Sequence, residues 1–243
     1  MNFTADIANR LIPLLDLTRL HDNDTTVSIQ KLCAEALTPL GPVAAVCIYP
    51  RFVGCAKNAL VGTSIKVATV VNFPGGDWTL VDCVAEIKRS MQDGADEIDV
   101  VMPYSFYLHG ETNYVLEFLQ VCRGVMGLKI TMKVILETGA LINADHIADA
   151  TDLAIEAGAD FIKTSTGKME INATLPAAEI ILKRIREHPD KKVGFKAAGG
   201  IYTVSQAAEY LQLAENMMGI LWISPQTMRF GASKLLQDIL HQK

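Results

Sequence analysis

The feature that most constrains the fold of this chain is a repeated alternation of short apolar runs with amphipathic stretches. The runs are continuous rather than alternating, which is typical of parallel strands with helices on both faces of the sheet. Eight such units in 243 residues predict an α/β fold with a single domain, a (β/α)8 TIM barrel over residues 1–243. The strands are expected at residues 11–17, 44–50, 66–74, 97–104, 132–139, 161–167 and 193–200, with the eighth in 219–232.

An internal repeat gives a register between two of these strands. DGADEIDVV (93–101) and AGADFIKTS (157–165) share a Gly-Ala-Asp lead and lie about two βα units apart. Aligning them places Asp99 at the position of Lys163. Strands two apart in a barrel contribute to the same interior layer, so we expect both side chains to point into one end of the barrel. A doubly wound open sheet is the alternative fold, but no GxGxxG follows the first strand.

Composition and charge argue against several classes of function. The 22 Lys and Arg residues against 27 Asp and Glu residues give a net charge of -5 without a basic stripe, so we expect no nucleic-acid partner. The apolar runs are too short to cross a bilayer, and the first residues lack the pattern of a signal peptide, so we expect no membrane association. Five cysteines without a CxxC pair predict free thiols and a cytoplasmic location, and the scattered histidines predict no metal site.

Polar side chains recur where the predicted strands end. In a barrel this is the C-terminal face, on which enzymes of this fold place their active sites. Any one of these residues alone would be interpreted as a solvated strand end. Two lysines on consecutive strands, with a carboxylate in register with one of them, favour a functional site instead. The positions are Asp16, Thr18, Cys47, Asn72, Asp99, Lys133, Glu137, Lys163 and Lys196.

Lys163 is the candidate nucleophile, because a neutral lysine amine can attack a carbonyl carbon and form an imine. Lys196 on the next strand is the candidate that lowers its pKa, since a second ammonium and partial desolvation both disfavour protonation. Asp99 is placed to move protons, directly or through a water, while a carbon-carbon bond breaks or forms. Lys133 is a second candidate nucleophile, with ion pairing to Glu137 or Asp99 as its alternative role. The set predicts a Schiff-base carbon-carbon lyase.

Three glycine-containing turns are candidates for holding a phosphate group: 165–168 (STGK), 197–203 (AAGGIYT) and 230–234 (FGASK). Glycines let backbone N–H groups approach an anion, and a following helix N-terminus adds a favourable dipole. The loops after the seventh and eighth strands are the usual phosphate site of this fold. With Lys168 and Lys234 beside them, these turns predict a phosphorylated substrate.

Eight segments, in chain order, have a familiar pattern: LLDLT, AAVCIYPRF, VATVVNFP, GADEIDVVMPY, KVILETG, GADFIKTSTGK, VGFKAAGGI and RFGAS. They resemble the deoxyribose-phosphate aldolase family, and the likeness runs from residue 16 to about residue 235. The resemblance implies a class I aldolase, an aldehyde lyase with a (β/α)8 barrel and neither metal nor organic cofactor. Such an enzyme reversibly cleaves 2-deoxy-D-ribose 5-phosphate into D-glyceraldehyde 3-phosphate and acetaldehyde during deoxyribonucleoside catabolism.

The resemblance also implies roles for individual residues. Lys163 matches the family's Schiff-base lysine, Lys196 the lysine that keeps that amine reactive, and Asp99 the acid/base carboxylate. The expected partner is a small phosphorylated sugar, and a homodimer is expected because family members are often dimers. The motifs and the resemblance together place these residues around the substrate and its phosphate: Asp16, Thr18, Cys47, Lys133, Thr166, Gly167, Lys168, Gly199, Gly200, Gly231, Ser233 and Lys234.

Two positions depart from the family pattern at the phosphate turns. Better-known members read GGVRT where this chain reads GGIYT, so Tyr202 takes the place of an arginine. They read GASS where this chain reads GASK, so Lys234 takes the place of a serine. We hypothesise that Lys234 restores the cation lost at Tyr202.

Two other functions stay open at this point. Another imine-forming barrel lyase, such as a transaldolase-like enzyme or a keto-acid aldolase, would share the reactive lysine and differ in its substrate. A catalytically silent barrel that binds a phosphorylated metabolite would bind its ligand without forming an imine. The presence of Lys163, Lys196 and Asp99 together argues against the silent barrel.

Overall fold

The computed structural model describes residues 3–141 and 143–241. Over these residues eight parallel strands close into a barrel in the order β1, β10, β9, β8, β7, β6, β5, β4. Each strand overlaps one of the predicted apolar runs, so the prediction of a (β/α)8 barrel is confirmed. The barrel strands are β1 (Leu15–Arg19), β4 (Ala45–Ile48), β5 (Lys66–Val71), β6 (Glu97–Val101), β7 (Thr131–Ile135), β8 (Phe161–Lys163), β9 (Gly194–Ala198) and β10 (Met228–Ala232).

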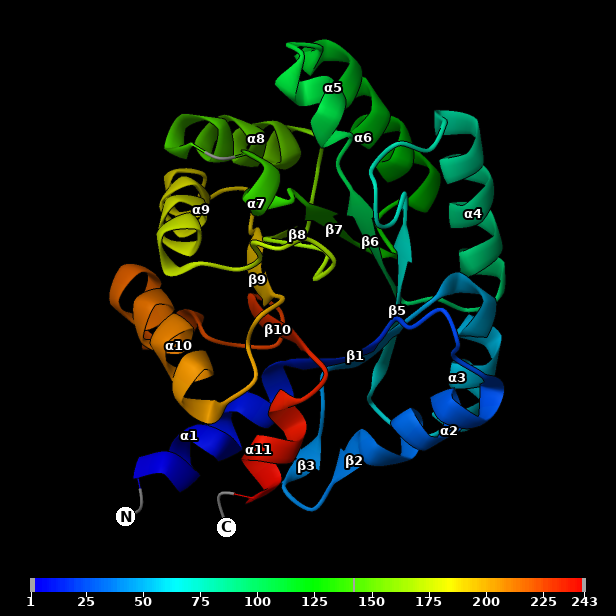
Figure 1. Cartoon of the computed structure of the whole chain (residues 1–243), viewed down its shortest axis with the longest axis vertical. Helices are drawn as coiled ribbons and strands as arrows, with labels where there is room; N and C mark the ends of the chain where they lie inside the picture. The colour runs from blue at the N-terminus through cyan, green and yellow to red at the C-terminus, as the bar shows by residue number, and fades with distance from the viewer. Residues whose placement is uncertain (1–2, 142, 242–243) are drawn as a thin grey trace.

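Helices surround this barrel as an outer layer (Figure 1). Helix α1 (Phe3–Leu11) packs against α11 (Leu235–His241), and both contact α10 (Val204–Met218), in the lower left part of Figure 1. None of the helices in the described part of the chain combines the length and the apolar character needed to cross a membrane. The helices are α1 (Phe3–Leu11), α2 (Thr26–Glu35), α3 (Val53–Ala59), α4 (Leu80–Gln92), α5 (Tyr104–Leu108), α6 (Thr112–Met126), α7 (Thr138–Leu141), α8 (Ala144–Glu156), α9 (Leu175–Glu187), α10 (Val204–Met218) and α11 (Leu235–His241).

Several loops on the C-terminal face of the barrel end at a residue whose side chain caps the next helix. Five loops, those after β1, β5, β7, β8 and β9, finish at a Thr or Asn whose side chain accepts a hydrogen bond from the backbone near the helix start. Such a cap satisfies an N–H group that the helix itself leaves unpaired. Each loop therefore passes from strand to helix at a defined residue. The caps are Thr25, Thr79, Asn143, Thr174 and Thr203.

The barrel interior has an apolar part and a charged part. The apolar part is a cluster contributed mainly by β4 and β5 and by the ends of neighbouring strands: Leu20, Ala45, Cys47, Ala68, Val70, Phe73, Val101 and Ile135. The charged part comes from β1 and from β6 to β10, and its side chains are buried: Asp16, Glu97, Asp99, Lys133, Lys163, Lys196 and Arg229. Charged groups are rarely buried without partners, so this half of the interior needs a functional explanation.

Two details differ from the sequence prediction. The first strand was expected over 11–17, but α1 continues to Leu11, a 3-10 turn covers Ile12–Leu14, and β1 begins only at Leu15. Pro13 explains this, because its fixed φ and missing N–H suit a helical turn better than the inside of a sheet. A short hairpin, β2 (Leu37–Thr38) with β3 (Gly41–Pro42), was also not predicted, since its two-residue strands contain no apolar run.

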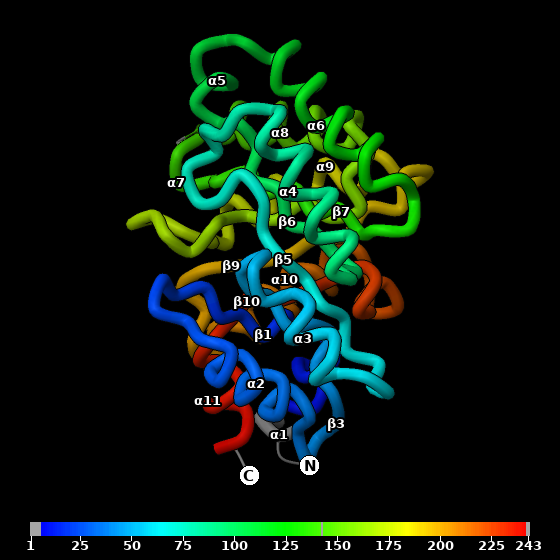
Figure 2. The backbone as a smooth tube through the Cα atoms, turned by 90° about the vertical axis from the view of Figure 1, so that its right-hand side faces the viewer, coloured from blue at the N-terminus to red at the C-terminus, as the bar shows by residue number. Residues whose placement is uncertain are grey.

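The loops that follow the strands gather on one side of the molecule. Seen from the side, the yellow-green segment after β8 projects from the same side as the blue segment after β1 (Figure 2). These segments belong to opposite parts of the chain, and closure of the barrel between β1 and β10 brings them together. This side is the C-terminal face, where the predicted site residues lie.

Candidate active site

Asp99 is the centre of the charged part of the barrel. Its Oδ2 atom accepts hydrogen bonds from Nζ of Lys163 and from Nζ of Lys196, each at 2.8 Å. Its Oδ1 atom accepts a third bond from Nζ of Lys133, also at 2.8 Å. Asp99 and Lys163 therefore do point into one end of the barrel, as the internal repeat predicts. Burial would raise the pKa of Asp99, but the three lysines hold it well below its ordinary value.

The register of the sheet explains how these side chains meet. Asp99 on β6 is the Cα partner of Lys133 on β7, and Lys163 on β8 is the partner of Lys196 on β9. Cα partners on neighbouring strands face the same side of the sheet, here the barrel interior, and the stagger of the barrel brings Asp99 and Lys163, two strands apart, to the same layer. A carboxylate and three lysines on four consecutive strands are thereby held within hydrogen-bond distance.

A second set of ion pairs closes the cluster on the side of β1 and β10. Asp16 accepts hydrogen bonds from Lys196 and from Arg229, and Arg229 also donates to Glu97 at 2.9 Å. Burial would raise the pKa of Asp16, but Lys196, Arg229 and Lys133 hold it below its ordinary value. The sequence analysis did not single out Arg229 or Glu97. Their signal was present as charges inside otherwise apolar strands.

Counting charges shows why Lys163 is the lysine of the cluster whose pKa is lowered. Four cationic side chains face three carboxylates in this cluster, so with every group ionised one positive charge is in excess. Among the described residues Lys163 has a single carboxylate partner, Asp99, and Lys196 shares the same oxygen. Burial lowers the pKa of Lys163 below its ordinary value, and Lys196 lowers it further against the attraction of Asp99. This is the direction of shift that the sequence analysis expects for Lys163.

The neighbouring lysines are shifted the other way. Burial opposes the charge on Lys196, but Asp16 and Asp99 raise its pKa above the ordinary value. Burial likewise opposes the charge on Lys133, and Asp99, Glu97 and Asp16 together raise its pKa. Both lysines are thus fixed as ammonium ions, which cannot act as nucleophiles. The ion pair of Lys133 is with Asp99, and Glu137 instead accepts hydrogen bonds from Thr166.

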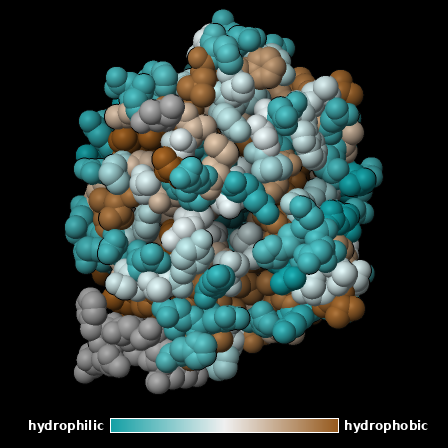
Figure 3. Space-filling view, in the orientation of Figure 1, coloured by the Kyte–Doolittle hydropathy of each residue, from teal (hydrophilic) through white to brown (hydrophobic). Residues whose placement is uncertain are grey.

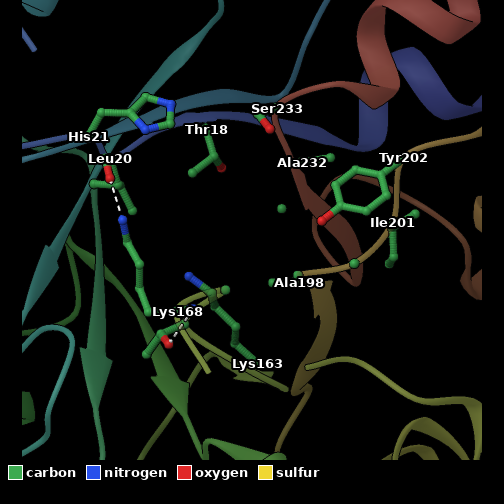
Figure 4. A pocket seen from close by; sticks show the side chains of 15 residues that line it. Thr18, Leu20, His21, Lys163, Lys168, Ala198, Ile201, Tyr202, Ala232 and Ser233 are labelled. Carbon is green, nitrogen blue, oxygen red and sulfur yellow. Dashed lines mark hydrogen bonds between the residues drawn. The ribbon is translucent and has the colours of Figure 1, made fainter. Parts of the chain in front are cut away.

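A pocket of about 150 Å³ opens above the cluster on the C-terminal face. Figure 3 shows this face hollowed near its centre, and Figure 4 shows the amine of Lys163 pointing into the pocket. Among the residues that line it, no carboxylate is present, and two are lysines. The lining residues are Thr18, Leu20, His21, Lys163, Thr166, Gly167, Lys168, Ala198, Gly199, Gly200, Ile201, Tyr202, Gly231, Ala232 and Ser233.

The structure divides the predicted site residues between the pocket and the layer beneath it. Nine of them line the pocket: Thr18, Lys163, Thr166, Gly167, Lys168, Gly199, Gly200, Gly231 and Ser233. Asp16, Asp99, Lys133 and Lys196 lie beneath them, fully buried in the charged cluster. The sequence analysis expected Lys133 to contact the substrate, but Lys133 does not line the pocket. Three carboxylates hold its side chain within the barrel.

The three glycine turns converge at one end of the pocket. Gly167, Gly199 and Gly200 have φ values of 81°, 85° and 81°, in the region that favours glycine. A Cβ atom on Gly167 would lie 3.9 Å from Cα of Gly199, so the turns after β8 and β9 approach closely. Lys168 crosses the pocket, and its Nζ donates to the carbonyl oxygen of Leu20 at 2.7 Å (Figure 4). This end of the pocket presents exposed backbone, and the Lys168 ammonium lies beside Leu20 on the side of the pocket away from Tyr202 (Figure 4).

Tyr202 and Lys234 meet at the edge of the same end. Nζ of Lys234 lies 5.6 Å from the centre of the Tyr202 ring, a cation–π contact. In Figure 4 the Tyr202 hydroxyl points into the pocket. Lys234 itself does not line the pocket, but it contacts the ring of Tyr202, which does.

Comparison with known proteins identifies the family. A model of the DeoC/LacD family aldolases matches residues 10–237. The chain belongs to the DeoC/LacD aldolase family. Its enzyme class is that of an aldolase, a lyase that makes or breaks a carbon-carbon bond.

Solved structures agree with this assignment. A proposed deoxyribose-phosphate aldolase from Coccidioides immitis is 29% identical, with a TM-score of 0.86 over 97% of this aldolase and 86% of the other chain. Another from Toxoplasma gondii ME49 is 26% identical, with a TM-score of 0.89 over 99% and 97% of the two chains. The tetrameric deoxyribose phosphate aldolase from Aeropyrum pernix is 22% identical, with a TM-score of 0.74 over 100% and 94%, and shows likeness of fold alone.

Cys47 lies inside this aldolase's barrel rather than in the pocket lining. Its side chain is fully buried within the apolar cluster, on the strand next to β1. Burial raises the pKa of the Cys47 thiol above its ordinary value. A thiol that keeps its proton is a poor nucleophile, and its position places Cys47 beneath the pocket rather than in the lining where the sequence analysis expected it. Over the described residues no group of three or more His, Cys, Asp or Glu side chains is arranged to hold a metal ion.

Proposed function

We propose that this aldolase reversibly cleaves 2-deoxy-D-ribose 5-phosphate into D-glyceraldehyde 3-phosphate and acetaldehyde through a Schiff base on Lys163. The observation that carries the proposal is the position of this amine. It is the cation of the cluster with a lowered pKa, and it opens into a pocket without carboxylates whose other end is made of glycine turns. A sugar phosphate would place its aldehyde at Lys163 and its phosphate at the turns.

The first step forms the imine. The free amine of Lys163 adds to the aldehyde carbon of the open-chain sugar, and loss of water gives the protonated Schiff base. The lowered pKa of Lys163 supports this step, because it increases the fraction of the amine that is free and available for attack. The surplus positive charge of the cluster disappears when Lys163 is neutral, so the reactive form is also the electrostatically balanced one.

The second step breaks the carbon-carbon bond. A base removes the proton of the hydroxyl group beside the breaking bond, glyceraldehyde 3-phosphate leaves, and the two remaining carbons stay on Lys163 as an enamine. Protonation of the enamine and addition of water then release acetaldehyde. Asp99 is fully buried but touches both Lys163 and Lys196 through Oδ2, so we propose that it moves protons through these groups or a bound water.

Three further proposals complete this picture. The whole chain, residues 1–243, acts as one catalytic domain that needs neither metal nor organic cofactor. All five cysteines are free thiols, which supports a cytoplasmic location.

The family resemblance supports a homodimer, whereas the Aeropyrum pernix protein is tetrameric. Light scattering on the purified chain would distinguish these assemblies.

The substrate is tested by assays that detect the product each substrate releases: acetaldehyde from either deoxyribose, coupled to an alcohol dehydrogenase, and the released aldehyde phosphate or keto acid from the other substrates, coupled to their own dehydrogenases. We expect turnover of 2-deoxyribose 5-phosphate at a much higher kcat/KM than of unphosphorylated 2-deoxyribose, a ketose phosphate or a 2-keto-acid aldol. Preference for a ketose phosphate or a keto acid would instead favour the transaldolase-like or keto-acid alternative. Ligand binding without turnover or imine formation would favour the silent barrel.

Lys234 is expected to strengthen binding of the phosphorylated substrate. Its ammonium lies on the ring of Tyr202 at the phosphate end of the pocket, so Lys234→Ser removes a positive charge near the anion. We expect KM for 2-deoxyribose 5-phosphate to rise roughly fivefold, as for an exposed charge pair, with kcat nearly unchanged. Lys234→Arg is the charge-keeping control. An unchanged KM in Lys234→Ser would show that Lys234 does not replace the missing arginine.

A further inference from the structure

Glu137 is a fully buried carboxylate next to the pocket that the steps above do not use. It lies two residues after the end of β7, and its φ of 56° is in the left-handed region that few non-glycine residues adopt. Among the described residues no cationic side chain lies within ion-pair distance of it, in contrast to the three carboxylates of the charged cluster. A buried carboxylate without a cation and with an unfavourable backbone needs a specific reason.

The side-chain carboxylate of Glu137 accepts all its hydrogen bonds from one residue, Thr166, in the turn after β8. The hydroxyl of Thr166 donates to Oε2 of Glu137 at 2.5 Å, and the Thr166 N–H donates to the same carboxylate at 3.2 Å. Burial raises the pKa of Glu137, and the two donors of Thr166, together with the charge of Lys163, act in the opposite direction. Nothing else in the described structure satisfies this carboxylate, so its position is tied to that of Thr166.

Thr166 passes this constraint to the residues that line the pocket. Its Oγ1 atom accepts a hydrogen bond from the backbone N–H of Lys168 at 3.1 Å, across Gly167. This bond sets the start of the Lys168 side chain, whose ammonium crosses the pocket to Leu20. Gly167 is held between them with a φ of 81°, facing Gly199.

We propose that Glu137 is a positioning residue for the phosphate end of the substrate, acting through Thr166 on the backbone of Gly167 and on Lys168. The inference deepens the proposed function and rests on it for the identity of the anion. In the described structure Glu137 is not among the residues that line the pocket, and its carboxylate is hydrogen-bonded to Thr166 rather than to Lys163. Its loss would therefore weaken binding of the phosphate and leave the imine chemistry intact.

The experiment compares two substrates that differ only in the phosphate. For 2-deoxyribose 5-phosphate we expect Glu137→Ala to raise KM about tenfold with little change in kcat, because two hydrogen bonds to a charged acceptor are lost. For unphosphorylated 2-deoxyribose we expect the same kcat/KM as in the wild type. Glu137→Gln is the matched control, since its amide oxygen can accept both bonds from Thr166, and it should restore KM to within about threefold of the wild type.

A double-mutant cycle tests the route through Thr166. Thr166→Val removes the hydroxyl from the other side of the contact, so we expect it to raise KM for the phosphorylated substrate to a similar extent. KM of the double variant should be no higher than KM of the single variant that binds the substrate less tightly. Equal losses on both substrates, or fully additive losses in the double variant, would overturn the proposal, because either result indicates a general effect on the fold.

Titration of the protein with inorganic phosphate separates this inference from the proposed function. The wild type is expected to bind phosphate about tenfold more tightly than Glu137→Ala, as measured by calorimetry. If the wild type fails to cleave 2-deoxyribose 5-phosphate while this difference is observed, the proposed reaction is wrong and the role of Glu137 stands. Equal phosphate affinity in the two proteins would refute the role of Glu137 whatever the reaction.

Discussion

Replacement of Lys163 by methionine is expected to abolish cleavage, with a loss of kcat/KM on the order of 10⁴-fold or more, as is usual when a covalent nucleophile is removed. The fold should survive. Lys163 contributes the surplus cation of the cluster, so its removal leaves three cations facing three carboxylates. Asp99 keeps its bonds to Lys133 and Lys196 and is not left as an unpaired buried charge.

The measurement is reductive trapping. Incubation with acetaldehyde and borohydride should convert the imine into a stable ethyl-lysine, which peptide mapping by mass spectrometry would place on Lys163. Lys168→Met is the matched control, because it removes another amine from the same pocket and should leave the label on Lys163. A label that persists in Lys163→Met, or that maps to Lys133 or Lys168, would assign the nucleophile elsewhere. Circular dichroism of the variants checks that they are folded.

The architecture was predictable because strands covered on both faces need continuous apolar runs. This pattern locates every barrel strand, and the Gly-Ala-Asp repeat adds the level at which Asp99 and Lys163 meet. The glycine turns were also visible in the sequence, since three of their glycines have the positive φ that other residues avoid. What the sequence supplied in these cases was local: hydrophobic period, turn chemistry and a repeated motif.

The partners of the buried charges were not predictable in the same way. Arg229 binds Asp16 across 213 positions of sequence, a contact that exists only because β10 closes the barrel onto β1. Ion pairing of Lys133 with Glu137 was one of the two pairings that the sequence analysis considered. The left-handed backbone at Glu137 turns its side chain to Thr166 instead. Which carboxylate a lysine meets depends on the register between strands, and no local pattern encodes that register for these pairs.

Replacement of Lys196 by methionine is expected to lower kcat/KM near neutral pH by about 10- to 100-fold and to move the activity toward higher pH. The reason is the charge balance of the cluster. In this variant three cations balance three carboxylates only while Lys163 keeps its proton. The Oδ2 atom of Asp99, which Lys163 and Lys196 share, would then pair with Lys163 alone, while Oδ1 keeps its bond to Lys133. Both changes raise the pKa of Lys163, which burial and Lys196 lower in the wild type.

The direction of the pH effect follows from the form of Lys163 that reacts. In the proposed mechanism the free amine of Lys163 attacks the aldehyde, so activity is expected to rise with pH through the pKa of Lys163. Each unit by which that pKa rises costs about tenfold in activity at pH values below it. The rising limb of kcat/KM between about pH 6 and pH 10 should therefore lie at higher pH in Lys196→Met than in the wild type, and much of the lost activity should return in alkaline solution. The pH dependence of the imine-trapping rate should shift equally, because it reports the amine alone.

Lys196→Arg separates charge from shape in this test. The guanidinium keeps the positive charge beside Lys163, so the rising limb should stay near its wild-type position even where the larger side chain lowers the rate. If the rising limb of kcat/KM lies at the same pH in Lys196→Met, in Lys196→Arg and in the wild type, Lys196 contributes geometry alone. Lys163 would then owe its lowered pKa to burial, the largest of its causes, and the count of four cations against three carboxylates would have no part in its reactivity.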